Sequence, residues 1–418
     1  MPIKNAATEK LAPELPLTAE QSQLVQQIND FAQKHFSDKQ ASVFVVEGEA
    51  GTGKSVVLTH LFNQWQIAAR TEPKSLFYHS NNRFLVNHPE VLKVYRQLAG
   101  EQPHLLKKDF QRPTTMINQL EKQDDHLDLV VIDEAHLLLS KPDHYNNFYH
   151  ENQLLEILKR SRVVVIVVDF RQVLRMKSLW TRERLEKLLA PYTTKFVKLR
   201  HQFRMQAPDE LVSWLDDFSD GIINPLPQNA RQGYDFRIFA DAEAMRQQII
   251  QRNQQVGLAR VLSTSGYPSI LDGGKHYIRE GKFKMPWDQY NFTQTPWAEI
   301  PETIDEVGSI YTCQGFDLNY AGIIIGPIFY LDPKTNRLEV DLSKYTDTEA
   351  FKRRKDLTDL VEIEQLKHLM IRNALNVILK RGVLGTYIYA HDPKLRQKLI
   401  NLFHEINPEV SRNEEKRP

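Results

Sequence analysis

The chain has 418 residues, of which 41% are hydrophobic and 26% charged, so it is long enough for two or more globular domains with sizeable cores. The formal net charge of +1 excludes a uniformly basic nucleic-acid-binding protein and leaves room only for a local basic surface. The single cysteine, Cys313, excludes an intrachain disulfide and a cysteine-based zinc site.

Short apolar runs alternate with amphipathic segments along the chain, a pattern that predicts an α/β fold with parallel sheets covered by helices on both faces. The apolar runs, such as residues 163–168, are of strand length, and the N-terminal sequence lacks the apolar stretch of a signal peptide. We therefore expect a cytoplasmic protein without a membrane partner. The expected divisions are an N-terminal arm over residues 1–14, a first domain over 15–198, a second domain over 199–405 and a flexible tail over 406–418.

The first motif in chain order is a glycine-rich loop between a predicted strand and a predicted helix. Residues 41–48, ASVFVVEG, combine β-branched and aromatic side chains, whereas residues 55–69 carry apolar side chains at helical spacing. In this context the spacing from Gly48 to Lys54 is typical of a phosphate-binding loop, whose glycines let backbone N–H groups point at an anion. The predicted phosphate-binding residues are Gly48, Glu49, Ala50, Gly51, Thr52, Gly53, Lys54 and Ser55.

Lys54 and Ser55 have the most specific predicted roles in this loop. The ammonium group of Lys54 would reach the β- and γ-phosphates of a nucleotide, and the hydroxyl of Ser55 would bind Mg²⁺. The N-terminus of the following helix adds the positive end of a dipole. The structural alternative is a glycine-rich turn with a chance lysine, and the strand and helix on either side argue against it.

An acidic pair ends the third predicted strand. Residues 75–80, SLFYHS, are predicted to form the second strand, and residues 128–136, DLVVIDEAH, contain the third. Asp133 would hold Mg²⁺, usually through water, and Glu134 would orient or deprotonate the attacking water. An acidic helix cap is the structural alternative, but the position of the pair after a phosphate-binding loop favours nucleotide hydrolysis.

The fourth predicted strand lies within residues 162–174, RVVVIVVDFRQVL, and ends at Asp169. Gln172 follows three residues later and is a candidate sensor of the γ-phosphate, because neighbouring strands of a parallel sheet end at the same edge. The alternative is an ordinary exit from a strand into a loop, which the segment taken alone would favour.

Three further segments give the chain a resemblance to a known family. They are KFVKLRHQFRM at 195–205, IYTCQGFDLNYAGIIIG at 310–326 and IRNALNVILKRGVLGTYIYA at 371–390. Together with the loop and the acidic pair, their order over roughly residues 17–390 resembles the superfamily 1 helicases, and more closely the helicase-like group related to the Schlafen C-terminal domain. The resemblance implies two tandem RecA-like domains with ATP bound between them. A superfamily 2 helicase is disfavoured, because no Ser-Ala-Thr element follows the fourth strand.

Several nucleotide contacts are implied by this resemblance alone. Gln21 would bind the adenine edge, Phe203 would pack on the adenine ring, and Arg204 and Arg381 would touch the γ-phosphate from the second domain. Asn376 departs from the pattern, because the Schlafen-like group leads us to expect an arginine there. Residues expected near the ribose and the cleft are Gln314, Gly315 and Asp317.

The implied partner is single-stranded DNA or RNA. Thr312 and the region after Tyr78 would face a nucleic-acid backbone. Residues 267–297 interleave aromatic and basic side chains, so Trp287 and Trp297 are candidates for base stacking. A loop packed by its own aromatic side chains is an equally good interpretation of this segment.

These features together predict an ATP-hydrolysing, nucleic-acid-dependent helicase or translocase that uses ATP and Mg²⁺. The alternative is a regulatory or signalling P-loop NTPase switch without unwinding activity. The basic run 352–355 is expected to be a solvated face in a helix-like stretch rather than a nucleic-acid patch.

Overall fold

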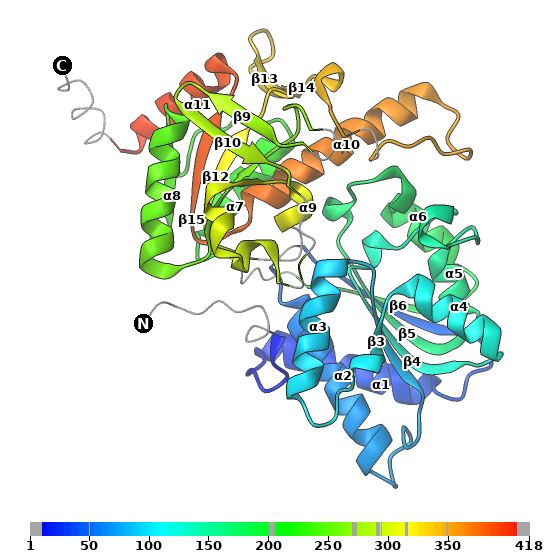
Figure 1. Ribbon diagram of the computed structural model, residues 1–418. Helices are drawn as coiled ribbons and strands as arrows, with labels where there is room; N and C mark the ends of the chain where they lie inside the picture. Colours follow the sequence, from blue (N-terminus) through cyan, green and yellow to red (C-terminus); the bar gives the residue numbers. More distant parts are fainter. Residues whose placement is uncertain are drawn as a thin grey trace, which may run out of the picture. The chain divides into compact units, whose positions relative to one another are not determined.

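The computed structural model describes residues 11–49, 51–199, 205–269, 274–289, 293, 295–313, 317–347 and 350–407. Its contacts divide the chain into two compact units, which are labelled by element in Figure 1. The N-terminal unit holds Ala6–Phe203 together with Lys352–Arg354, and the C-terminal unit holds Arg204–Phe351 and Lys355–Pro418. We had expected the division between residues 198 and 199.

The N-terminal unit is built on a six-stranded sheet with the order β3-β2-β4-β5-β1-β6, in which every neighbouring pair is parallel. Long runs of β-branched residues form the central strands, as expected where both faces of a parallel sheet are covered. The strands are β1 (Ser42–Glu47), β2 (Asn82–Val86), β3 (Phe110–Gln111), β4 (Leu127–Asp133), β5 (Ser161–Val168) and β6 (Thr193–Lys198).

Helices cover both faces of this sheet (Figure 1). On one face, α1, α2 and α3 pack against Phe44, Phe84, Val131 and Val165 in a continuous apolar core. The alternate strand residues, such as Val164, are also fully buried, and α4 and α5 lie on that side. The helices are α1 (Ala19–His35), α2 (Lys54–Thr71), α3 (Pro89–Glu101), α4 (Pro113–Gln123), α5 (Gln153–Leu158) and α6 (Arg182–Leu189).

The prediction of a second strand at residues 75–80 was wrong. These residues form turns, with the N–H of Tyr78 donating to the carbonyl of Ser75 and His79 at a φ of +63°. The left-handed conformation of His79 interrupts an extended backbone, and Phe77 packs in the core against Phe36 and against Trp65 of α2. The strand lies just beyond, at Asn82–Val86.

The C-terminal unit has a seven-stranded sheet with the order β7-β15-β12-β8-β11-β10-β9, parallel except for the antiparallel β9–β10 pair, and a separate antiparallel pair β13–β14. The strands are β7 (Asp235–Ile238), β8 (Ala259–Ser263), β9 (His276–Glu280), β10 (Phe283–Trp287), β11 (Val307–Gly308), β12 (Leu318–Ile325), β13 (Phe329–Asp332), β14 (Arg337–Val340) and β15 (Gly382–Ala390).

Two apolar cores enclose the larger sheet of this unit. Residues of α7, α10 and α11 pack on one face, and α8 packs on the other, in a core that includes side chains of the edge strands β9 and β10. The helices are α7 (Asp209–Ser219), α8 (Ala242–Val256), α9 (Ile310–Cys313), α10 (Leu360–Leu379) and α11 (Pro393–Glu405). The two sheets, each parallel for the most part and flanked by helices, confirm the predicted α/β fold with parallel sheets covered by helices.

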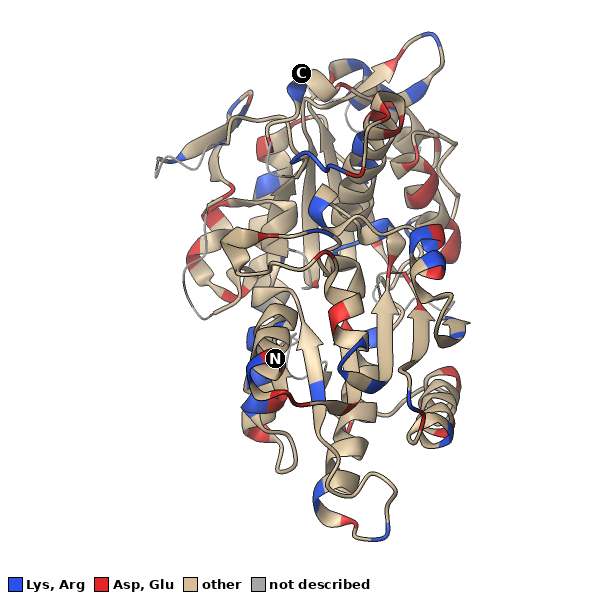
Figure 2. Ribbon diagram, turned by 90° about the vertical axis from the view of Figure 1, so that its right-hand side faces the viewer, with Lys and Arg blue, Asp and Glu red and all other residues tan. Residues whose placement is uncertain are grey.

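The basic run at residues 352–355 differs in part from the expectation of a solvated helical face. It is not helical, and although Lys352, Arg353 and Lys355 are exposed as expected, Arg354 is only 5% exposed. Its guanidinium group donates to the hydroxyl and carbonyl of Ser140 and to the carbonyl of Met176, so this arginine is an internal anchor of the N-terminal unit. Elsewhere Lys and Arg positions are interspersed with Asp and Glu positions (Figure 2). No helix among the described residues is long and apolar enough to cross a membrane.

Candidate nucleotide site

The sheet order of the N-terminal unit brings three predicted motifs to one edge. Strand β5 lies between β1 and β4, and all three are parallel. Their carboxyl ends therefore meet at the same edge, where β1 leads into the glycine-rich loop, β4 ends at Asp133 and β5 is followed by Asp169. Because ligands of open parallel sheets bind beyond the carboxyl ends of the strands, this edge is the candidate site.

The loop after β1 has the backbone that its glycines predict. Gly51 and Gly53 have φ values of +86° and +74°, and Gly53 is the N-cap of α2. A Cβ atom at Gly48 would meet the Thr52 hydroxyl oxygen at 2.8 Å and Leu199 at 3.3 Å. Side chains at these positions would thus strain or block the turn that aims the helix N-terminus at the edge. Ala50 lies outside the described residues.

Lys54 is held inside this loop. Its side chain is 6% exposed, and its ammonium group donates to the carbonyl oxygens of Gly48 at 2.7 Å and Glu49 at 2.5 Å. The Asp169 carboxylate lies 3.9 Å away, beyond hydrogen-bond distance. The charge of Lys54 is therefore solvated by dipoles of the loop and only loosely paired with a carboxylate.

Ser55 and Asp133, the two predicted Mg²⁺ ligands, are in direct contact. The Ser55 hydroxyl donates to Asp133 Oδ2 at 3.0 Å, and the Tyr95 hydroxyl donates to the same oxygen at 2.6 Å. Burial, followed by the charge of Glu134, raises the pKa of Asp133 to about 6, whereas these two hydrogen bonds act in the opposite direction. Sequence analysis missed Tyr95, whose position in α3 looks like that of an ordinary core aromatic residue.

Glu134 and Gln172 occupy the same edge. Glu134 has a φ of +53°, a strained value for a residue with a side chain, and such strain is concentrated at functional sites. Its Oε2 atom lies 3.2 Å from Nε2 of His136. Gln172 is 3% exposed, and its amide nitrogen donates to Asp169 Oδ2 at 2.9 Å. The structure thus brings the acidic pair and the predicted sensor together with Lys54.

Gln21 lies in the N-terminal unit, in the first turn of α1. It forms a capping box with Thr18, because its side-chain oxygen accepts the Thr18 N–H at 3.0 Å and its own N–H donates to the Thr18 hydroxyl. The side chain is buried, at 6% exposure. This hydrogen bond fixes the orientation of the carboxamide and leaves a second lone pair on its oxygen.

Four further predicted residues fall outside the described residues, namely Phe203 of the N-terminal unit and Arg204, Gln314 and Gly315 of the C-terminal unit. Arg381 is described and lies between α10 and β15 with its side chain only 1% exposed, while Asp317 immediately precedes β12. The hydroxyl of Thr312 accepts the Ser309 N–H at 2.9 Å and donates to the Ser309 carbonyl at 3.0 Å, so it stabilises the start of α9.

Trp287 and Trp297 are core residues of the C-terminal unit, at 3% and 2% exposure. Their indole N–H groups donate to the Pro268 carbonyl and to Glu306. A ring that stacks on a base needs an open face, so the structure favours the alternative of a segment packed by its own aromatic side chains.

Asn376, the departure from the family pattern, is also buried. Its amide nitrogen donates to the carboxylate of Asp216 and the hydroxyl of Ser219. Lys380 donates to the same carboxylate at 2.6 Å. The position therefore belongs to a polar network that joins α7 to α10 inside the C-terminal unit.

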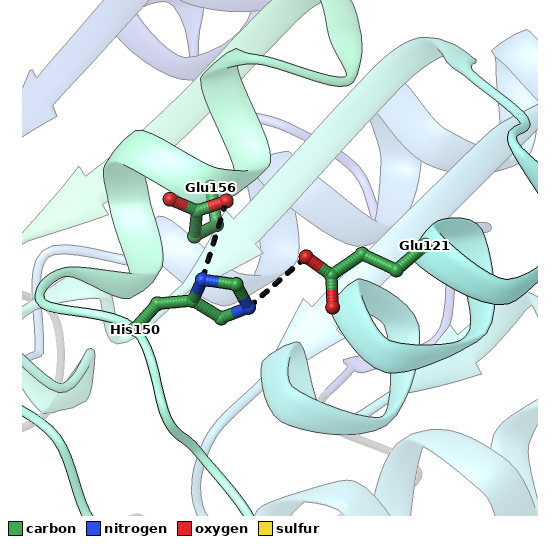
Figure 3. A group of neighbouring side chains, drawn as sticks. All are labelled: Glu121, His150 and Glu156. Carbon is green, nitrogen blue, oxygen red and sulfur yellow. Dashed lines mark ion pairs between the residues drawn. The ribbon is translucent and has the colours of Figure 1, made fainter.

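A second cluster of potential ligands lies away from this edge. Within the described part of the chain, one group of His, Cys, Asp or Glu side chains is close enough to hold a metal ion, namely Glu121, His150 and Glu156 (Figure 3). Arg160 donates to both carboxylates at 2.9 Å, and Lys159 donates to Glu156 at 2.6 Å. These two cations already balance the two carboxylates, so we interpret the cluster as an ion-pair network.

The fold and the edge of the N-terminal unit define the class of P-loop NTPases. The chain belongs to the family of Schlafen group 3, DNA/RNA helicase domain, whose family model matches residues 41–392. It is 36% identical over 427 residues to "Uncharacterized protein YPL245W" of Saccharomyces cerevisiae (strain ATCC 204508 / S288c), covering 95% of this chain and 93% of that protein. Among solved structures, a "crystal structure of DNA replication initiation factor" matches with a TM-score of 0.26 and 15% identity, over 46% of this chain and 50% of that one.

Proposed function

We propose that this protein is an ATP-hydrolysing, nucleic-acid-dependent helicase or translocase. The observation that carries the proposal is the convergence, at one sheet edge, of Lys54, the Ser55–Asp133 pair and Glu134. Family membership supports the same class of activity. The nucleotide would bind the loop between β1 and α2, with its phosphates on the backbone N–H groups and on Lys54.

The residues at this edge suit Mg²⁺. A serine hydroxyl and a carboxylate are hard oxygen donors, and their 3.0 Å contact places them close enough to share one ion. Bound Mg²⁺ would neutralise charge on the phosphate oxygens and, by its own charge, favour the ionised form of Asp133. Tyr95 would hold the carboxylate in place through its hydrogen bond.

Three side chains would have separate roles in hydrolysis. Glu134 would accept the proton of the attacking water or orient that water, and Lys54 would stabilise the charge that develops on the transferred phosphoryl group. Gln172, held by Asp169, would sense the γ-phosphate. Loss of the contact between Gln172 and the γ-phosphate on hydrolysis would change the conformation of the loop after β5.

The motor proposal also assigns roles to Phe203 and to residues of the C-terminal unit. In line with the family resemblance, ATP would lie between two RecA-like domains, with Phe203 on the adenine, Arg204 and Arg381 on the γ-phosphate, and Gly315 and Asp317 near the ribose. Arginine suits this role because its charge is permanent and its donors match phosphate oxygens. In the same arrangement, Thr312 would face the backbone of bound single-stranded DNA or RNA.

The test is a steady-state ATPase assay at low salt, without polymer and with single-stranded DNA or RNA, using Lys54→Ala as the control. Turnover that is absent in the variant and stimulated by at least one polymer is the expected result, and the stimulation should weaken steeply as salt rises. The net charge of +1 gives the regulatory switch some support as a second candidate. ATP turnover indifferent to both polymers would favour that switch, and no turnover at all would overturn both.

A further inference from the structure

The hairpin of β9 and β10, at one edge of the seven-stranded sheet of the C-terminal unit, has two faces of different chemistry (Figure 1). Ile278, Phe283 and Met285 lie on one face and pack in the apolar core beside α8. On the other face and in the turn, the exposed side chains are cations and one tyrosine. The exposed side chains of residues 274–289 are Lys275, Tyr277, Arg279, Lys282 and Lys284.

The two carboxylates of this segment do not balance the exposed cations. Glu280 is buried, at 8% exposure, and accepts the Tyr267 hydroxyl at 2.6 Å. Asp288, directly after β10, accepts the Ser269 hydroxyl at 2.7 Å. No ion pair joins an exposed cation of the hairpin to a carboxylate in the described part of the chain. The exposed face of the hairpin therefore carries an unbalanced positive charge.

The cations of this face are also close together. Arg279 lies directly opposite Lys284 in the antiparallel register. The Cβ atoms of such a pair are about 5 Å apart, and like charges at this separation destabilise a hairpin. The separation is below the Debye length of about 8 Å at physiological ionic strength, so the potentials of the two charges add. A bound polyanion would relieve their repulsion and gain from the combined potential.

Tyr277 places an aromatic ring among these charges. It is 37% exposed, and its ring centroid lies 5.1 Å from Nζ of Lys284 and 5.9 Å from Cζ of Arg279. Both distances are within the range of cation–π attraction, which holds the ring beside the cations. Unlike the rings of Trp287 and Trp297 in the core, this ring is open to solvent and can stack on a base.

A second hairpin of the same unit, β13–β14, has a balanced surface. Tyr330 is also 37% exposed, but it lies opposite Glu339. Arg337 lies opposite Asp332, and Lys334 is exposed in the turn. The two basic and two acidic side chains of this hairpin cancel in charge. An exposed hairpin of this protein is therefore not basic by default, and β13–β14 provides matched controls.

We propose that the exposed face of the β9–β10 hairpin binds single-stranded nucleic acid, with its cations on phosphates and Tyr277 stacked on a base. This inference rests on the proposed function, whose nucleic-acid partner it assigns to a surface. A phosphate backbone supplies the anions that the hairpin lacks. A single strand fits the surface better than a duplex, because a side-chain ring stacks on a base that is unpaired and accessible.

The test is equilibrium binding of fluorescently labelled oligothymidylate and oligouridylate to the full chain, in EDTA and without nucleotide. Lys282→Ala combined with Lys284→Ala should weaken binding at least about 10-fold at low salt. It should also lower the slope of log affinity against log salt by about 1.4, because each phosphate contact with a single strand contributes about 0.7. The matched control, Lys334→Ala combined with Arg337→Ala, removes the same charge and should change affinity by less than about twofold.

A second pair of variants tests the ring. Tyr277→Ala should weaken binding about 5- to 150-fold and leave the salt slope unchanged, because it removes a stacked ring and keeps every charge. Tyr330→Ala, the control of equal exposure, should change affinity by less than about twofold. The substituted side chains are all exposed, so each variant should retain the Tm of wild type, which circular dichroism measures.

Several outcomes would overturn the proposal. If the cations only prevent edge strand β9 from pairing with other chains, the double lysine variant should self-associate in sedimentation and bind oligonucleotides like wild type. Loss of binding in that variant but not in Tyr277→Ala would indicate a surface for polyanions in general. No binding of either oligonucleotide by wild type would also refute the surface. Wild type that binds through the hairpin but shows no ATP turnover would instead refute the proposed function alone, which keeps the two failures distinct.

Discussion

Two buried lysines, one in each unit, show how the same group can serve different purposes. Lys380 is 2% exposed at the end of α10 and donates to the Asp216 carboxylate at 2.6 Å. Lys54 is 6% exposed at the start of α2, donates to two carbonyl oxygens, and has its carboxylate, Asp169, 3.9 Å away. The first charge is matched by a carboxylate in hydrogen-bond contact. The second is solvated mainly by loop dipoles, which phosphate oxygens can replace at little cost.

The largest expected effect is on ATP turnover, which should depend on Lys54 and not on Lys380. Lys54→Ala should abolish ATP turnover, a loss of at least about 1,000-fold, because it removes a charged donor at the transferred phosphoryl group. Lys380→Ala, measured in the same ATPase assay at a temperature where the variant remains folded, should keep turnover within a few-fold. A Lys54→Ala protein with turnover within a few-fold of wild type would refute the assignment of the loop.

The second prediction concerns the acidic pair beside Lys54. Glu134→Gln should lower kcat by about 100- to 10,000-fold while ATP affinity stays near that of wild type, because it removes the base and leaves the Ser55–Asp133 pair in place. Nucleotide binding by fluorescence titration and single-turnover hydrolysis measure the two quantities separately. Loss of ATP binding in this variant would contradict the division of roles between Asp133 and Glu134.

Much of the functional edge could be predicted from sequence, because motifs that follow the strands of a parallel sheet must lie at the same edge of that sheet. The carboxyl ends of β1, β4 and β5 must meet at one edge, so a loop, an acidic pair and Gln172 at three strand ends come together. Tyr95 and His136 were not predicted as site residues. Their contacts depend on how α3 packs and on the register of β5 beside β4, which no local pattern records.

The composition of a segment proved less informative than motif spacing. The aromatic and basic side chains of residues 267–297 gave two equally good interpretations, because composition does not say which face of a strand is covered. The structure places Trp287 and Trp297 in the core. Residues 75–80 misled for a related reason, since a short run of apolar and aromatic side chains occurs in packed turns as well as in strands.

The third prediction tests the structural lysine. Lys380→Met should lower the free energy of unfolding of the C-terminal unit by about 3 kcal/mol, because it leaves a largely buried carboxylate without its charged partner. Asp216 is 21% exposed and keeps a hydrogen bond from Asn376, which limits the loss. The control is Lys344→Met, whose side chain is 49% exposed and lies 3.6 Å from Asp341, and which should change stability by less than about 0.5 kcal/mol. Urea denaturation with a probe in this unit makes the measurement, and equal effects at the two sites would remove the distinction.

The smallest expected effect is on the pH dependence of the N-terminal unit, where the buried groups of the functional edge oppose one another. Burial lowers the folded pKa of His136 to about 4 from an ordinary 6.5, so the unfolded chain binds more protons and stability falls as pH drops from 6.5 towards 4. Burial raises the folded pKa of Asp133 to about 6 from 3.8, so the folded chain binds more protons and stability rises as pH drops from 6 towards 3.8.

Because the two windows nearly coincide, these groups should largely cancel in the wild-type protein. Without Mg²⁺, we expect their combined effect on the free energy of unfolding between pH 7.5 and pH 5 to be within about 1 kcal/mol. Asp133→Asn removes one side of the balance, so acidification to pH 5 should then destabilise the N-terminal unit by about 2 kcal/mol through His136. Urea denaturation in EDTA at both pH values, for wild type and Asp133→Asn, measures this difference. If the variant and the wild type lose the same stability on acidification, the carboxyl group of Asp133 is not protonated in the folded protein at pH 5. The difference in electrostatics between the two units would then come from Lys54 alone.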